Sequence, residues 1–186
     1  MGSLIKLETP LTDKVVGGLR IGDKVYISGI IYTARDAAHK KLIDLIEEGG
    51  KPPFELQGAI IYYVGPAPSK PGQPMNSAGP TTSYRMDPYS PKLISLGLKG
   101  MIGKGERGIN VVEAMIKHKA VYFAATGGAA ALIAKSIVNA EIIAYPELGA
   151  EAIRKLTVID FPAIVAQDCY GGNLFSEGKA RYRVED

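Results

Sequence analysis

The 186 residues suffice for one domain with a substantial core, and 46% hydrophobic with 22% charged residues is ordinary for a globular protein. A net charge of +3, with no block of lysine and arginine, argues against a nucleic-acid partner, and no apolar run approaches the roughly 18–20 residues of a membrane span. The single cysteine, Cys169, excludes an internal disulfide, cannot alone hold a zinc or iron–sulfur site, and fits a reducing compartment.

The chain begins without the charged-then-apolar layout of a signal peptide, so we expect a cytoplasmic protein. Hydrophobic patterning then predicts alternating strands and helices. Strands are expected at Leu4–Leu7, Lys24–Ile31, Gly58–Val64, Gly100–Ile102, Ala120–Ala125, Ala140–Ala144 and, on either side of Phe161-Pro162, within Thr157–Val165. Helices are expected at Ala37–Ile46, Tyr89–Leu98, Ile109–His118, Ala129–Val138 and Ala150–Leu156.

Several details refine this pattern. Thr33 is the expected cap of the first helix, and Phe161-Pro162 should place its strands at a sheet edge or bend. The segment Gly65–Gly79 has four prolines and few apolar residues, which is typical of a functional or mobile loop. Strands and helices mix without strict βαβ regularity. We therefore expect one α/β domain over residues 1–186, with a central mixed sheet flanked by helices and a partly ordered tail at 177–186.

The stretch Gly79–Met86, Gly-Pro-Thr-Thr-Ser-Tyr-Arg-Met, carries the strongest chemical signal. If a helix opens after its proline, Thr81 and Arg85 share one face and can address a small anion together. Thr81 and Thr82 could also cap that helix, whose positive end favours a carboxylate or phosphate. Lys104, presented by a Gly-Lys-Gly turn, would add an ammonium group. The alternative is a capped helix with a surface arginine.

A second candidate group follows the strand Lys24–Ile31. Arg35, Asp36 and His39 are spaced so that all three can face one way at the start of a helix. An arginine directly after the carboxyl end of a strand is where α/β folds often contact ligands. The alternative is a solvated first turn, in which Asp36 complements the helix dipole and His39 is exposed.

Three further features carry weaker signals. The Gly127-Gly128 junction could cradle a phosphate, but it lacks the spacing of a nucleotide-binding loop, and close helix–strand packing also explains it. His118 is interpreted as a charge partner at a helix C-terminus. Cys169 is interpreted as structural, since no histidine lies near it in the sequence.

Taken together, these segments resemble the β-subunit of the two-subunit, iron–sulfur-dependent class I fumarases and L-tartrate dehydratases. The resemblance covers roughly Leu4 to Asn173 in the family's order. The matching segments are Gly22-Asp23, Ala34–His39, Gly79–Met86, Gly100–Gly105 and Ala125–Ala130. Of these, the Gly-Pro-Thr-Thr…Arg-Met and Gly-Lys-Gly segments are specific to the family.

The resemblance implies a swivelling β/β/α domain that closes over a partner α-subunit. In the family, three cysteines of that partner hold a 4Fe-4S cluster, and this chain would bind no metal itself. The implied assembly is a hetero-oligomer. The implied reaction is reversible hydration of fumarate to L-malate, or dehydration of tartrate, and the motifs fit both of these C4 dicarboxylates.

The resemblance also implies roles for single residues. Arg35 and Arg85 would bind substrate carboxylates, Lys104 would add a third positive charge, and Thr81 matches the catalytic base proposed for the family. Asp36 and His39 would support Arg35, whereas Thr82 could serve as a cap or as a second hydroxyl contact. The competing hypothesis is a stand-alone small-anion or nucleotide-binding module built on the glycine junctions, without a partner.

Overall fold

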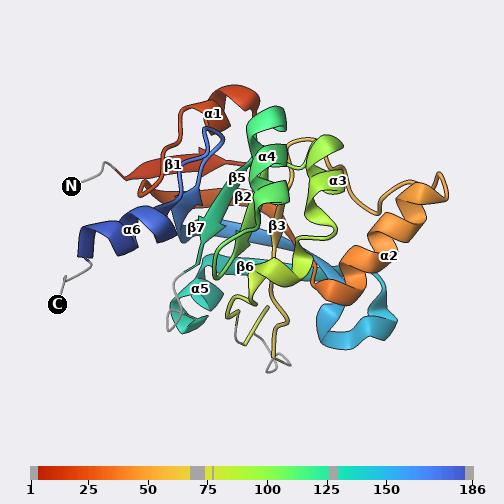
Figure 1. Cartoon of the computed structure of the whole chain (residues 1–186). Coiled ribbons are helices and arrows are strands. Elements are labelled where there is room, and N and C mark those ends of the chain that lie inside the picture. The colour runs from red at the N-terminus through yellow and green to blue at the C-terminus, as the bar shows by residue number, and fades with distance from the viewer. Residues whose placement is uncertain (1–3, 68–73, 77, 126–129, 183–186) are drawn as a thin grey trace.

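The computed structural model describes residues 4–67, 74–76, 78–125 and 130–182 (Figure 1). Within these ranges the strands join into one mixed sheet in the order β1-β2-β3-β4-β5-β7-β6, which confirms the expected α/β class. The pairs β1–β2, β2–β3, β3–β4 and β4–β5 are parallel, whereas β7 runs antiparallel to β2, β5 and β6. The strands are β1 Ile5–Glu8, β2 Lys24–Thr33, β3 Ile60–Tyr62, β4 Gly100–Gly103, β5 Val121–Ala124, β6 Ile137–Ala144 and β7 Ile153–Gln167.

The long strand β7 closes the sheet on itself. It pairs with β2 along most of its length and with β5 near its end. The pairings β2-β3-β4-β5-β7-β2 therefore form a closed ring, to which β1 and β6 are added. A closed ring leaves none of its five strands with an open edge, so the cost of unpaired backbone groups is avoided there.

Helices cover the outside of this ring, and α2, α3 and α4 lie together beside β3 and β5 (Figure 1). The helices are α1 Asp13–Gly17, α2 Asp36–Glu47, α3 Ser90–Ser95, α4 Ile109–His118, α5 Ala130–Ser136 and α6 Leu174–Tyr182, with 3₁₀ helices η1 Ser83–Met86 and η2 Pro146–Glu151. Among the residues described, no helix has the length and apolar character needed to cross a membrane.

Strand alternation divides the buried residues into two clusters. In β3, Ile60 and Tyr62 belong to a cluster to which every strand of the ring contributes, while Ile61 belongs to the cluster under α2, α3 and α4. Successive side chains of a strand point to opposite faces, so one strand serves both clusters. The first cluster lies inside the ring, and the second attaches the helical layer that carries part of the site.

The predicted helix Ala150–Leu156 is wrong. The 3₁₀ helix η2 ends at Glu151, where Gly149 breaks the helical conformation with φ 58°, and β7 begins at Ile153. The segment's apolar residues fit a strand as well as a helix, and pairing with β2 and β6 decides for the strand.

Of the two alternatives expected for Phe161-Pro162, a sheet edge or a bend, the structure has the bend. β7 bends there, since Asp160 has φ 50° and the register against β2 shifts between Ile27 and Gly29. However, the segment is no edge, because Pro162 lies opposite Tyr26 within the ring. One bulge lets the strand carry its proline and remain paired on both sides of it.

Thr33 is not the cap of α2. Its hydroxyl donates to the carbonyl of Ala152 at 3.3 Å and accepts from the amide of Arg154 at 3.0 Å, so it ties β2 to β7. The N-cap position belongs to Arg35, which makes no side-chain capping bond. The tail predicted at 177–186 is helical as far as Tyr182, and its last residues lie outside the described part of the chain.

Candidate functional site

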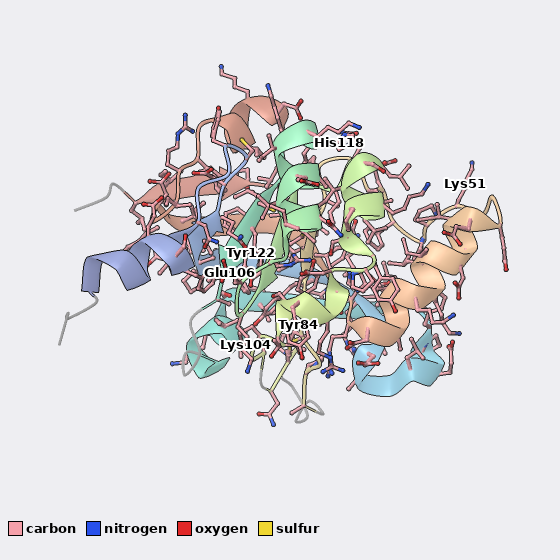
Figure 2. The ribbon with its side chains drawn as sticks, viewed as in Figure 1. Lys51, Tyr84, Lys104, Glu106, His118 and Tyr122 are labelled. Carbon is pink, nitrogen blue, oxygen red and sulfur yellow. The ribbon has the colours of Figure 1, made fainter. Side chains whose placement is uncertain are left out.

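The candidate site lies where three neighbouring parallel strands end. Arg35 follows β2, the chain returns beside the end of β3 at Thr81, and Lys104 directly follows β4. Carboxyl ends of parallel strands meet at one edge of a sheet, which is where such folds bind ligands. Figure 2 shows Lys104 and Tyr84 together at this end of the molecule, with His118 at the opposite end.

Backbone hydrogen bonds place Thr81 beside Lys104. The amide of Thr81 donates to Tyr63 O at 2.7 Å, Lys104 N donates to Thr81 O at 3.3 Å, and Ser83 N donates to Lys104 O at 2.9 Å. Thr82 and Lys104 thus form a short parallel bridge that extends the sheet beyond β4. The threonine segment and the lysine turn are held as one unit.

The helix expected after Pro80 is reduced to η1. Thr82 occupies the N-cap position of this 3₁₀ helix without a side-chain capping bond, so the prediction that the threonines cap a helix is wrong. Backbone bridging to Lys104 holds Thr81 and Thr82 in an extended conformation instead. Their hydroxyls are therefore not used by a helix terminus.

Asp36 connects the two candidate arginines. Its Oδ1 lies 2.9 Å from Arg85 Nε, and its Oδ2 lies 3.8 Å from Arg35 Nη2. Arg35 Nε also lies 3.2 Å from Glu151 Oε1. These side chains are partly exposed, between 23% and 44%, and we assign the pairs to orientation of the arginines more than to stability. The prediction that Asp36 orients Arg35 stays a prediction, and the contact it requires is present.

Gly65 gives the Arg35 guanidinium its place. A Cβ at position 65 would lie 2.6 Å from Arg35 Nη1 and 3.3 Å from its Cδ. A side chain at position 65 would force the end of the Arg35 side chain to move. Neither Gly65 nor Glu151 was singled out from the sequence as a site residue, because their contacts with Arg35 join segments far apart in the chain.

The Lys104 side chain is exposed. Across residues 4–67, 74–76, 78–125 and 130–182, its ammonium group takes part in no ion pair. Arg85, with a side chain 44% exposed, is also accessible beside its Asp36 contact. This edge of the sheet therefore presents cations to the solvent beside two partly buried threonines, a combination that suits a small oxyanion.

His39 is fully buried, and the alternative in which it is exposed is wrong. Its Nδ1 donates to the carbonyl of Arg35 at 2.8 Å, and its ring packs edge-on against Tyr63. Burial lowers its pKa to about 4, because desolvation disfavours the charged ring more than the Arg35 carbonyl and Asp36 favour it. His39 is therefore neutral at pH 7. Its ring bonds to the carbonyl of Arg35, the N-cap residue of the same helix.

The remaining candidates do not join this group. Gly127 and Gly128 lie outside the described residues. The carbonyl of His118 accepts from the Lys99 ammonium at the far end of the sheet. Cys169 is buried in the cluster inside the ring, and burial with the nearby Asp168 charge raises the pKa of its thiol, as expected for a structural cysteine.

The donor set does not fit an iron–sulfur cluster. The whole chain has one cysteine. Its described part holds no group of three or more histidine, cysteine, aspartate or glutamate side chains placed to bind a metal ion. A cubane cluster requires several thiolates, which this chain does not have.

Stability should fall in acid because of His39. The unfolded ring titrates near pH 6.5 and the folded one near 4, so the unfolded state binds more protons between these values, and the free energy of unfolding should drop by about 3 kcal/mol from pH 7 to pH 4. Chemical denaturation across this range, compared with His39→Gln, measures the effect. Parallel curves for parent and variant would contradict it.

Comparison with known proteins agrees with the motifs. A sequence model of the family described as Fumarase C-terminus matches residues 2–178. The anaerobic class I fumarate hydratase of Escherichia coli is 42% identical over 84% of this chain, but the match spans only 29% of that longer protein.

Two β-subunits match over nearly their full length. The L(+)-tartrate dehydratase subunit beta of Escherichia coli is 36% identical over 93% of this chain and 87% of that protein. A Methanocaldococcus jannaschii protein, whose name marks it as a candidate L(+)-tartrate dehydratase subunit beta, is 40% identical over 90% of this chain and 89% of its own length. The resemblance read from the motifs is thereby confirmed, and the chain belongs to the fumarase C-terminus family.

Proposed function

We propose that this chain is the β-subunit of a hydro-lyase that adds water to, or removes it from, a C4 dicarboxylate. The observation that carries the proposal is the joint placement of Thr81, Arg85 and Lys104, with Arg35 attached through Asp36, at one edge of the sheet. Cations can hold both carboxylates of such a substrate, and a hydroxyl beside them can move a proton.

Each residue has a defined task in this proposal. The Arg35 and Arg85 guanidinium groups bind carboxylate oxygens, and their shared partner Asp36 limits the directions in which they point. Lys104 contributes an ammonium beside Thr81, to which it is bonded through the backbone. A threonine hydroxyl is a weak base, so it can take a proton only where neighbouring cations stabilise the alkoxide. Thr82 offers a second hydroxyl contact.

The reaction also needs a partner. Because the donor set of this chain does not fit a 4Fe-4S cluster, the cluster is assigned to an α-subunit. The longer fumarate hydratase of Escherichia coli, of which the match spans 29%, has room for such a second part in one chain. Residues 1–186 would then be one domain of a hetero-oligomer, and the single cysteine supports a cytoplasmic setting.

Two substrates stay in the proposal, fumarate and L-tartrate. The near-complete match to proteins named as β-subunits of tartrate dehydratase favours the two-subunit organisation. The same match supports tartrate as a candidate substrate. The stand-alone phosphate-binding module is less well supported. A Cβ at Gly103 would overlap Ser83 Oγ. Packing against Ser83 therefore explains this glycine without a bound anion.

The isolated chain should be folded but inactive on fumarate, malate and tartrate, because it supplies cations and a hydroxyl group without the cluster. Activity should appear when a cluster-bearing α-subunit is added under anaerobic, iron-replete conditions. Assays of each subunit alone and of the mixture measure this. Turnover by this chain alone would refute the assignment of this chain as a subunit that needs a partner.

Replacing Arg85 or Arg35 by methionine should reduce kcat/KM of the reconstituted enzyme about ten- to a hundredfold, since a charged hydrogen bond to a carboxylate is worth about 1.5–3 kcal/mol. Arg20→Met is the control, because Arg20 contacts carbonyls of Gly17 and Leu19 away from this edge. An Arg85→Met enzyme with normal kinetics and a much lower melting temperature would make Arg85 structural.

Thr81→Val should lower kcat about a hundred- to ten-thousandfold, the range of general acid–base catalysis, while KM changes little. Valine keeps the branched shape, and the hydrogen bonds of Thr81 to Tyr63 and Lys104 use its backbone, so melting should hardly change. Thr82→Val on the same segment is the comparison, because loss of its proposed hydroxyl contact should raise KM and change kcat far less. Turnover within tenfold of the parent would remove Thr81 from the catalytic residues.

A further inference from the structure

Behind the candidate site lies a buried cation that the proposed chemistry does not use. The Arg107 side chain is 0% exposed, and its Nε donates to Asp87 Oδ1 at 2.7 Å. Its Nη2 donates to Ser90 Oγ at 2.6 Å, and its Nη1 donates to Tyr63 OH at 3.1 Å. All three nitrogen atoms of the guanidinium group thus have oxygen partners inside the protein.

The Arg107–Asp87 pair joins the two segments that carry the site. Asp87 directly follows η1, two residues after Arg85, and Arg107 lies three residues after Lys104. The second oxygen of Asp87 accepts from the amide of Gly108 at 2.7 Å, so one carboxylate is bonded to both the side chain and the backbone of the lysine segment. The amide of Arg107 is itself fixed by Gln167 Oε1 of β7 at 2.9 Å.

Tyr122 makes a second link between the same two segments. Its hydroxyl lies 2.8 Å from Ser83 Oγ and 2.8 Å from the carbonyl of Gly105. Figure 2 shows Tyr122 of β5 next to Glu106, and Glu106 belongs to the loop that carries Lys104. The Ser83 hydroxyl also packs against Gly103, where a Cβ would overlap it. The threonine segment and the lysine loop are therefore joined by buried side chains as well as by backbone hydrogen bonds.

A buried ion pair is weak support for stability, because apolar residues of similar volume can often replace it without loss. Directional bonds are what an apolar replacement cannot supply. We propose that Arg107 and Asp87 are positioning residues, which set where Thr81 and Arg85 lie relative to Lys104. This rests on the proposed function for its catalytic consequence, but its structural part concerns the isolated chain alone.

The test uses Arg107→Met with Asp87→Asn, which removes both charges and keeps an oxygen acceptor for Gly108. The matched control is Lys99→Met with Asp13→Asn, since Lys99 is a 7% exposed cation paired with Asp13 at 2.7 Å at the other end of the sheet. Hydrogen exchange of the isolated chain should be about tenfold faster at the Ser83 and Lys104 amides in the site double variant, and unchanged there in the control.

In the reconstituted enzyme, the site double variant should lose about tenfold or more in kcat, because small misplacements of reacting groups are costly. KM should rise by a smaller factor than kcat falls, since Arg85 is displaced with Thr81 but Arg35 is held separately by Asp36 and Glu151. Unchanged exchange at Ser83 and Lys104 would overturn the inference, as would a uniform rise in exchange across the sheet. A parent complex inactive on every dicarboxylate would refute the function and leave the exchange result standing.

Discussion

Closure of the sheet by β7 is the constraint on which the rest of this structure depends. One strand of fifteen residues pairs with β2 and β5, so the parallel strands β2 to β5 are locked into a ring with their carboxyl ends on one side. The bulge at Asp160 and the hydroxyl bonds of Thr33 both serve this closure. Parallel pairing of β2, β3 and β4 brings the segments after them to one edge, and β7 adds there the turn that carries Glu151.

At that common edge, charge is distributed with opposite signs interleaved. Asp36 lies between Arg35 and Arg85, and Glu151, delivered by the turn before β7, contacts Arg35 from the other side. Lys104 stays accessible on its turn. Carboxylate partners orient the arginines, and their partial exposure leaves the charges available to an incoming anion. The fully buried Arg107, in contrast, uses its nitrogen atoms on the protein itself.

In the proposed function, membership of the fumarase C-terminus family explains why the candidate site has cations and threonine hydroxyl groups but no group of metal ligands among the described residues. Relatives of this chain include a β-subunit of similar length and a class I fumarate hydratase more than three times as long as the matched part. A domain that serves either as a subunit or as a region of a longer chain need not contain every reacting group. The cations and hydroxyl groups on one edge are what such a half would contribute to a shared site.

The sequence alone predicted the strands that form the parallel part of the sheet and the helix Ile109–His118, and it proposed Arg35, Thr81, Arg85 and Lys104 as site residues, because periodicity and short motifs are local signals. It failed at residues 150–156, where apolar spacing fits helix and strand alike, and pairing with β2 and β6 decided the outcome. Tertiary structure alone placed Asp36 between two arginines, buried His39 and joined Arg107 to Asp87. The Asp36–Arg85 and Arg107–Asp87 contacts join segments that are separated in the sequence, and no local pattern encodes which partners will meet.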